Sequence, residues 1–225
     1  RAQLQDNTTQ TTDSLINAAS AHHKPETFLQ WVIATADRVA SGFEREAFDA
    51  YNAAKDENTE TKTGRNHYQA RQLSLFEQIR LDGKDLKITA KDLQWRYPLK
   101  ALSPTAIFPQ KREQCEPGED GKAQAEYKAL WNDFLAALES IPKSHRSNWP
   151  LWLDHFDTAW MTFTHAIPAA TAFGTKPEVS LYDHSKTTAA LATALWRWHE
   201  DAGQTNANAA QQLKDVTTGA CKNCC

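Results

Sequence analysis

Hydrophobic residues recur every three or four positions over much of this chain, which is the spacing of an amphipathic helix. One such stripe consists of Trp152, Phe156, Trp160 and Phe163, and a proline follows it at position 168. Proline lacks the backbone N–H that a helix needs, so the helix should end before it. The same reasoning predicts four long helices, over residues 27–41, 127–141, 150–167 and 183–202. Two shorter candidates lie at residues 14–22 and 206–216.

A period of two replaces the helical spacing in the middle of the chain. Apolar and polar residues alternate from Leu73 to Leu81, and the Asp-Gly pair that follows is typical of a turn. Returning strands should lie within residues 87–102. Polar stretches without helical spacing, residues 55–66 and 111–122, separate this region from the helical ones and read as loops.

These patterns predict a mainly α protein with a small antiparallel β insertion. We expect four consecutive parts along the chain. They are a first helical segment at residues 1–66, the β-containing insertion at 67–110, a second helical segment at 111–203, and a linker with a cysteine-rich end at 204–225.

Composition changes this picture little. The formal net charge of −3 over 225 residues gives no overall basic field that would attract nucleic acid. No stretch approaches the roughly 18 apolar residues that a membrane helix needs, and no signal-peptide pattern is present. Cys115 stands alone and the other cysteines crowd the last five positions, which is no disulfide framework. We therefore expect a soluble cytoplasmic protein that does not bind membranes.

Tryptophan is unusually frequent, with eight residues, and most of them fall in the second half of the chain. Aromatic residues at helical spacing are more often core residues than a ligand platform, so we expect them to form the core. The tryptophans concerned are Trp131, Trp149, Trp152, Trp160, Trp196 and Trp198. The basic residues of the segment KSHRSN, residues 143–148, should be exposed in a loop.

Residues 180–195, SLYDHSKTTAALATAL, read as a helix opened by Asp183 and His184. An acidic side chain at a helix start can accept the unpaired N–H groups of the first turn. A histidine there feels the positive end of the helix dipole, which favours its neutral form. Taken alone, such a segment is more often an ordinary capped amphipathic helix.

Four segments, in this order, resemble one protein family. They are AHHKP with ADRVASG (residues 21–25 and 36–42), RQLSLFEQI (71–79), YPLKALSP (97–104) and SLYDHSKTTAALATAL (180–195). The chain also opens with Arg-Ala, and the resemblance covers roughly residues 1–216. The chain is similar to the N-terminal HD-domain region of the large subunit of type III-A CRISPR effectors, the Csm type.

This resemblance implies an HD-domain-like helical bundle that cuts single-stranded DNA when the complex binds target RNA. The implied partners are the other Csm subunits, guide RNA, target RNA and the single-stranded DNA substrate. The parent protein would also make cyclic oligoadenylates from ATP, through a palm domain that carries a Gly-Gly-Asp-Asp motif. That motif is absent from this sequence, so ATP is expected only in a palm domain that is not in this chain.

The resemblance also assigns roles to individual residues. His22, His23 and Asp37 would bind a divalent metal, Mn²⁺, Ni²⁺ or Mg²⁺, because imidazole and carboxylate groups suit such ions. A metal of this kind lowers the pKa of bound water and generates a nucleophile for phosphodiester attack. Asp183 and His184 would be catalytic groups, with Asp183 also capping its helix and His184 neutral and pointing toward the cluster of His22 and Asp37. Without the resemblance, a His-His pair at a helix end is more often a capping or surface feature.

One feature of the sequence departs from the family pattern, and a second has more than one interpretation. The His-Asp dipeptide that gives HD proteins their name is absent, which leaves His22, His23 and Asp37 an incomplete ligand set. The chain would then either begin downstream of that dipeptide or come from a member that lost it. Cys221 and Cys224 resemble half of a zinc site, and an incidental terminal cluster, or a junction of separate pieces of a longer protein, is the alternative.

Two other functions remain open from the sequence. An HD-type phosphohydrolase of small nucleotides would use the same kinds of ligand but would need an enclosed pocket. A non-catalytic helical scaffold domain of the complex would explain the missing dipeptide. Metal content separates the scaffold from the two enzymes, and a comparison of DNA with nucleotide substrates separates the enzymes from each other.

Overall fold

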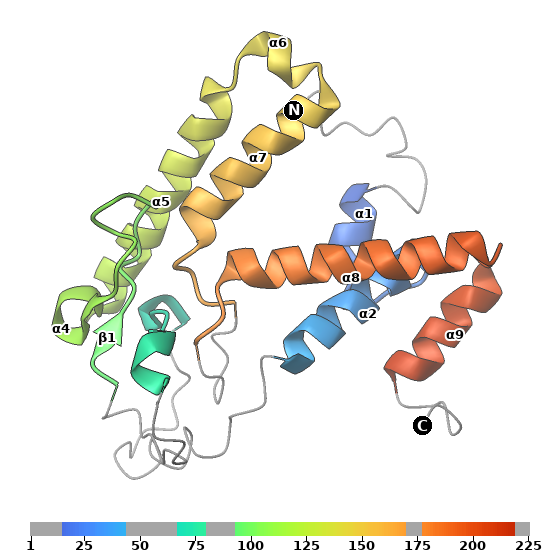
Figure 1. Cartoon of the computed structure of the whole chain (residues 1–225), viewed down its shortest axis with the longest axis horizontal. Helices are drawn as coiled ribbons and strands as arrows, with labels where there is room; N and C mark the ends of the chain where they lie inside the picture. The colour runs from blue at the N-terminus through green and yellow to red at the C-terminus, as the bar shows by residue number, and fades with distance from the viewer. Residues whose placement is uncertain (1–14, 44–66, 80–92, 170–176, 219–225) are drawn as a thin grey trace. The chain divides into compact units, whose positions relative to one another are not determined.

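The computed structural model describes residues 15–43, 67–79, 93–169 and 177–218 (Figure 1). It is mainly helical with a small two-stranded antiparallel sheet, as the sequence predicts. Contacts divide the chain into unit 1, Arg1–Phe43 with His184–Cys225, and unit 2, Glu44–Asp183. Unit 1 therefore combines residues from both ends of the chain.

Unit 1 contains α1 (Leu15–Ser20), α2 (Phe28–Phe43), most of α8 (Leu181–Asp201) and α9 (Ala207–Thr217). Its core forms where α9 packs on α2, and the hydroxyls of Thr35 and Thr217 join the two helices at 2.8 Å. The weaker helix candidate at residues 206–216 is therefore a helix that carries part of the core. The buried core residues are Trp31, Val32, Ala210 and Leu213, with Phe28, Ala192 and Leu195 packed against them.

Local signals in the sequence explain where these helices begin and end. Thr27 and Gln30 form a reciprocal cap at the start of α2: the Thr27 hydroxyl accepts the Gln30 N–H, and the Gln30 side chain accepts the Glu26 N–H at 2.8 Å. Asn206 accepts two N–H groups at the start of α9. Gly203, with φ +64°, takes the left-handed conformation that ends α8.

Unit 2 is built around a helical hairpin of α5 (Asp120–Ser140) and α7 (Trp149–Thr164), with the short α6 (Lys143–Arg146) between them (Figure 1). Phe134 on α5 is 6% exposed, and its ring meets three rings of α7 edge to face. These rings belong to Phe156, Trp160 and Phe163. The hairpin is thus held by aromatic contacts around one central ring.

The small sheet pairs β1 (Trp95–Arg96) with β2 (Gln110–Lys111), and α4 (Arg112–Cys115) follows directly. Two 3₁₀ turns, η1 (His67–Gln69) and η2 (Leu75–Gln78), precede it. The predicted strand from Leu73 to Leu81 is wrong over Leu75–Gln78. Among the described residues of this segment, 73–79, only Leu73 pairs with the sheet, through a bridge to Arg96. The predicted turn at residues 82–83 and the first part of the returning strand lie outside the described residues.

The hydrogen bonds around Leu73 explain why the predicted strand does not continue. The Leu73 N–H donates to the Pro177 carbonyl at 2.8 Å, and the Tyr97 N–H donates to the Gln72 carbonyl at 3.0 Å. After Ser74 the chain turns, because the Glu77 carboxylate accepts the backbone N–H groups of Gln94 and Trp95. A side chain therefore takes the backbone partners that a continuing strand would have used.

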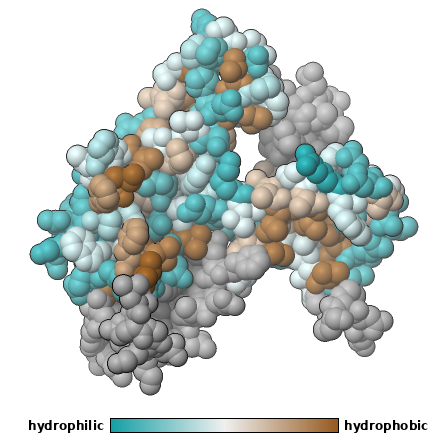
Figure 2. All heavy atoms as spheres, in the orientation of Figure 1, coloured by the Kyte–Doolittle hydropathy of each residue, from teal (hydrophilic) through white to brown (hydrophobic). Residues whose placement is uncertain are grey.

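Most of the tryptophans do not form the core that the sequence predicts. Of the eight, Trp31 alone is buried, while Trp152 and Trp160 are half-buried. The prediction is wrong for four of the expected core residues, Trp131, Trp149, Trp196 and Trp198, which are exposed. The helices of unit 2 pack through one face each, and apolar side chains remain visible among polar ones on the molecular surface (Figure 2).

Aromatic rings instead stack along α7. Successive rings at Trp149, Trp152, Phe156 and Trp160 lie nearly parallel, with centroids 5.3, 5.2 and 6.0 Å apart. The spacing of three and four residues brings them above one another on one side of the helix. The helical periodicity therefore correctly predicted that these residues share one face of α7, although that face is only partly buried.

No helix in the described ranges is long and apolar enough to cross a membrane.

Burial of His165 predicts a loss of stability in mild acid. Burial lowers the pKa of this imidazole below its usual 6.5. The unfolded chain therefore takes up a proton more readily, so this contribution to stability is complete above about pH 6.5 and is lost as the pH falls through the folded-state pKa. His165→Gln should flatten the melting temperature between about pH 7.5 and pH 5, measured by circular dichroism. The same change at the exposed His23 is the control, and an equal flattening there would contradict the assignment.

Candidate functional site

Asp37 and His184 meet in unit 1, although they lie 147 positions apart in the sequence. The Nε2 atom of His184 is 3.1 Å from Oδ1 of Asp37, and the two side chains are 16% and 30% exposed. The expected orientation of His184 toward Asp37 is therefore observed. Both side chains are partly exposed, so solvent can reach the pair.

The position of Asp37 follows from the small residues of α2. Ala36 and Ala40, one turn apart, are 0% and 1% exposed, so this face of the helix is completely buried. Asp37 follows Ala36 directly and therefore lies about 100° around the helix from it, at the edge of the buried face. A carboxylate in this position can reach a neighbouring helix without being enclosed.

The start of α8 sets the position of His184. The helix begins at Leu181, not at Asp183 as the sequence analysis expects. Ser180 is the capping residue: its hydroxyl accepts the Asp183 N–H at 3.0 Å and donates to the Asp183 carboxylate at 2.6 Å. The expectation that Asp183 caps the helix is corrected accordingly, because its carboxylate supports the cap rather than forming it. His184 is the next residue, and its ring faces Asp37.

His22 and His23 follow the end of α1 and face each other. Their ring centroids are 4.0 Å apart, and His22 Nδ1 is 2.6 Å from the Ala19 carbonyl oxygen. Among the residues that the structure describes, no group of three or more His, Cys, Asp or Glu side chains is placed to hold a metal ion. His22 and His23 thus form one pair, and Asp37 with His184 another.

The donor chemistry of Asp37 and His184 fits a divalent cation, since a carboxylate oxygen and an imidazole nitrogen are the usual partners of such ions. The pair supplies two donors, whereas protein metal sites commonly use three or four protein groups. The second proposed metal site, at Cys221 and Cys224, lies outside the described residues.

The chain was also compared with known proteins. No protein-family model, no curated protein and no solved structure matches it. Arguments about function therefore rest on the residues and their geometry.

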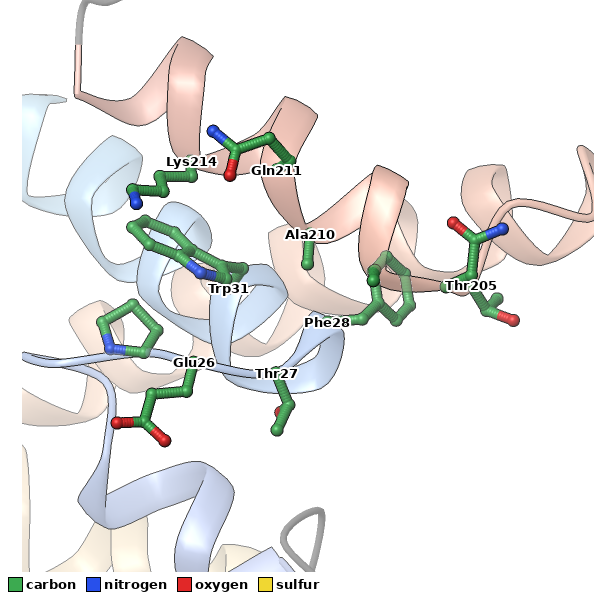
Figure 3. Close-up of a pocket in the computed structure, with 11 residues that line it drawn as sticks. Glu26, Thr27, Phe28, Trp31, Thr205, Ala210, Gln211 and Lys214 are labelled. Carbon is green, nitrogen blue, oxygen red and sulfur yellow. The ribbon is translucent and has the colours of Figure 1, made fainter.

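A cavity of about 580 Å³ opens elsewhere in unit 1, between the start of α2 and α9 (Figure 3). Trp31 and Phe28 supply its apolar wall, while Glu26, Gln211 and Lys214 bring polar and charged groups. Asp37 and His184 do not line it. This cavity was not predicted from the sequence. The available signal was the pattern of α9, in which buried Ala210 and Leu213 alternate with exposed polar neighbours.

The basic segment at residues 143–148 differs from the exposed loop that the sequence predicts. Part of it forms α6, and His145 Nδ1 lies 2.8 Å from His155 Nε2 with the two rings stacked. Arg146 donates from Nε to the Ile141 carbonyl at 2.8 Å, which closes the end of α5. These side chains stabilise the hairpin turn, so they favour a structural role over contact with nucleic acid.

Proposed function

We propose that this chain is the HD-domain-like region of a type III-A CRISPR effector large subunit, and that it cuts single-stranded DNA in a metal-dependent reaction. One observation carries the proposal: the 3.1 Å contact between Asp37 and His184. It joins the segments at residues 36–42 and 180–195, which are two of the segments that carry the resemblance. A chance resemblance gives no reason for these two segments to place an acid and an imidazole in contact.

The two side chains have complementary tasks in this proposal. Asp37, when ionised, can only accept hydrogen bonds, so its contact with His184 places a proton on Nε2 and fixes the orientation of the ring. Carboxylate–histidine pairs of this kind orient histidines that bind metals or transfer protons. A divalent metal, Mn²⁺, Ni²⁺ or Mg²⁺, would supply an activated water for attack on phosphorus. Asp183 supports this arrangement through its bond to Ser180, which holds the start of α8.

Recognition of the nucleic acid would lie largely outside this chain. In RNA-guided effectors, base pairing with the guide RNA selects the target, so the protein itself need not read bases. This fits the net charge of −3. The other Csm subunits, guide RNA and target RNA remain the proposed partners, and synthesis of cyclic oligoadenylates from ATP remains a proposal for the parent protein.

The cavity of Figure 3 favours a second candidate, a phosphohydrolase of small nucleotides. Its volume of about 580 Å³ falls within the range of ligand pockets. The partly exposed Phe28 offers an aromatic surface for a base, and Lys214 offers a cation for a phosphate. The distribution of residues argues for the first candidate, because Asp37 and His184 do not line this cavity.

Removing either member of the pair tests the proposal. In the complex assembled with guide and target RNA, Asp37→Ala and His184→Ala should each slow cleavage of single-stranded DNA by about 100-fold or more. Binding of target RNA should persist, because neither side chain is proposed to contact it. Lys214→Ala serves as the control and should cleave DNA at the normal rate.

Each other outcome has a clear meaning. Full cleavage by Asp37→Ala refutes the proposal. Hydrolysis of nucleotides that Lys214→Ala abolishes would favour the phosphohydrolase. A complex that binds no divalent metal and cuts neither substrate would identify a helical scaffold domain.

A further inference from the structure

Unit 2 contains a cavity of about 470 Å³ with three aromatic side chains on its walls. Phe76, Trp95 and Phe108 are 72%, 40% and 71% exposed, although aromatic residues normally bury most of their surface. A group of apolar rings held on the surface is typical of a binding site. Ser74, Glu77 and Pro109 complete the walls.

The local fold holds these groups in fixed positions. Successive side chains of a strand point to opposite faces, so in β1 the buried Arg96 points inward and Trp95 outward. Glu77 connects η2 to β1, since its two carboxylate oxygens accept the backbone N–H groups of Gln94 and Trp95, each at 2.8 Å. Trp95 and Glu77 are therefore positioned relative to each other by the backbone and not by flexible side chains.

Two polar groups in this cavity have unused capacity. Glu77 forms no ion pair with any cation in the described part of the chain. Each of its oxygens accepts one N–H and has a lone pair left for a second donor. The hydroxyl of Ser74, a residue only 1% exposed, has no hydrogen-bond partner within the described ranges. A buried polar atom without a partner is unfavourable, so a ligand that bonds to it would gain.

We propose that this cavity binds the guanidinium group of an arginine side chain presented by a partner protein. Aromatic faces carry negative charge density and attract cations, and a planar guanidinium also stacks on them. The Glu77 carboxylate supplies the opposite charge, and the Ser74 hydroxyl can accept an N–H. Phosphate and carboxylate ligands are disfavoured, because the lining includes an acid and no basic residue.

Other cations match the cavity less well. A quaternary ammonium group could sit among the rings, but it has no N–H to donate to Glu77 or Ser74. A lysine ammonium can donate, but it is a compact point charge that does not stack. Arginine uses the rings, the carboxylate and the hydroxyl at the same time.

A peptide titration tests this inference. The purified 225-residue chain is mixed with a capped Gly-Arg-Gly peptide, or with the same peptide carrying citrulline or lysine in place of arginine. The indole N–H of Trp95 is followed by NMR. Citrulline has nearly the shape of arginine without its charge. It should bind at least about tenfold more weakly, because the charge-assisted bonds are lost.

Variants of the walls locate the site. Phe76→Ala and Phe108→Ala, both at exposed positions that should not affect folding, should each weaken arginine binding by about two- to fivefold. Trp149→Ala, an exposed ring on α7 that does not line the cavity, is the matched control and should bind normally. Glu77→Gln should weaken binding further, with circular dichroism checking that the fold is retained.

Several results would overturn the inference. Equal binding of the arginine and citrulline peptides would indicate a purely apolar site. Unchanged binding in both phenylalanine variants would place the peptide elsewhere. A Trp95 signal that does not move at about 10 mM peptide, well above a millimolar dissociation constant, would exclude a guanidinium site.

Discussion

Replacing Phe134 by alanine should lower the free energy of unfolding by about 3–5 kcal/mol. The ring is 6% exposed and meets Trp160 and Phe163 at centroid distances of 5.9 and 5.8 Å. Edge-to-face pairs of this kind add to the gain from burial alone. Phe134 also borders an apolar cavity of about 150 Å³, so its removal would enlarge an existing void between α5 and α7. Enlarged cavities destabilise because the surroundings relax only partly.

Chemical denaturation followed by circular dichroism would measure this loss. Leu135→Ala is the matched control: it removes an apolar side chain from the next position of the same helix, but one that is 39% exposed. Its cost should be about 1 kcal/mol or less, as for other surface substitutions. Equal losses for the two variants would mean that the hairpin is not centred on Phe134.

Replacing Arg71 by methionine should cost about 3 kcal/mol or more. Its side chain is 0% exposed and forms an ion pair with Glu126, which is 32% exposed. The guanidinium also donates to the carbonyls of Tyr68 and Ala70 at 2.6 and 2.9 Å. Removing it leaves these acceptors and the Glu126 charge without their donor, and that penalty exceeds the net value of the pair.

A double variant separates the causes. Arg71→Met combined with Glu126→Gln should recover part of the loss, because the uncompensated charge is gone. Arg112→Met is the control, since Arg112 pairs with Glu116 on the surface and is 40% exposed. Surface pairs contribute about 1 kcal/mol or less. A loss as large for Arg112→Met as for Arg71→Met would show that burial of the guanidinium is not the cause.

Helices were predictable from the sequence because their signals are local. The stripes of apolar residues predicted α2, α5, α7 and α8, and the prolines at positions 142 and 168 predicted where α5 and α7 end. The predicted ends of the helices were less accurate where two local signals compete. At α8 the acidic Asp183 predicted the start, whereas the pattern Ser-x-x-Asp is itself a capping signal that places the cap at Ser180, three residues earlier.

Features that depend on distant partners were harder to predict. The alternation from Leu73 onward favours a strand. The Glu77 carboxylate instead accepts the backbone N–H groups of Gln94 and Trp95, and no pattern near Glu77 in the sequence predicts these partners. The exposure of Trp131 and Trp149 depends on which elements pack against their faces of α5 and α7, and hydrophobic periodicity carries no information about those elements. The meeting of Asp37 and His184 was expected only through the family resemblance.

The aromatic stack of α7 gives unit 2 an optical signal of its own. Rings at Trp149, Trp152, Phe156 and Trp160 lie with planes 9°, 16° and 9° apart, held in a chiral arrangement by the helix. Near-ultraviolet circular dichroism detects such fixed aromatic geometry and loses it when packing is lost, even where helical content survives. Because the stack lies entirely within unit 2, its share of this band reports the packing of that unit, whereas the buried Trp31 contributes the signal of unit 1.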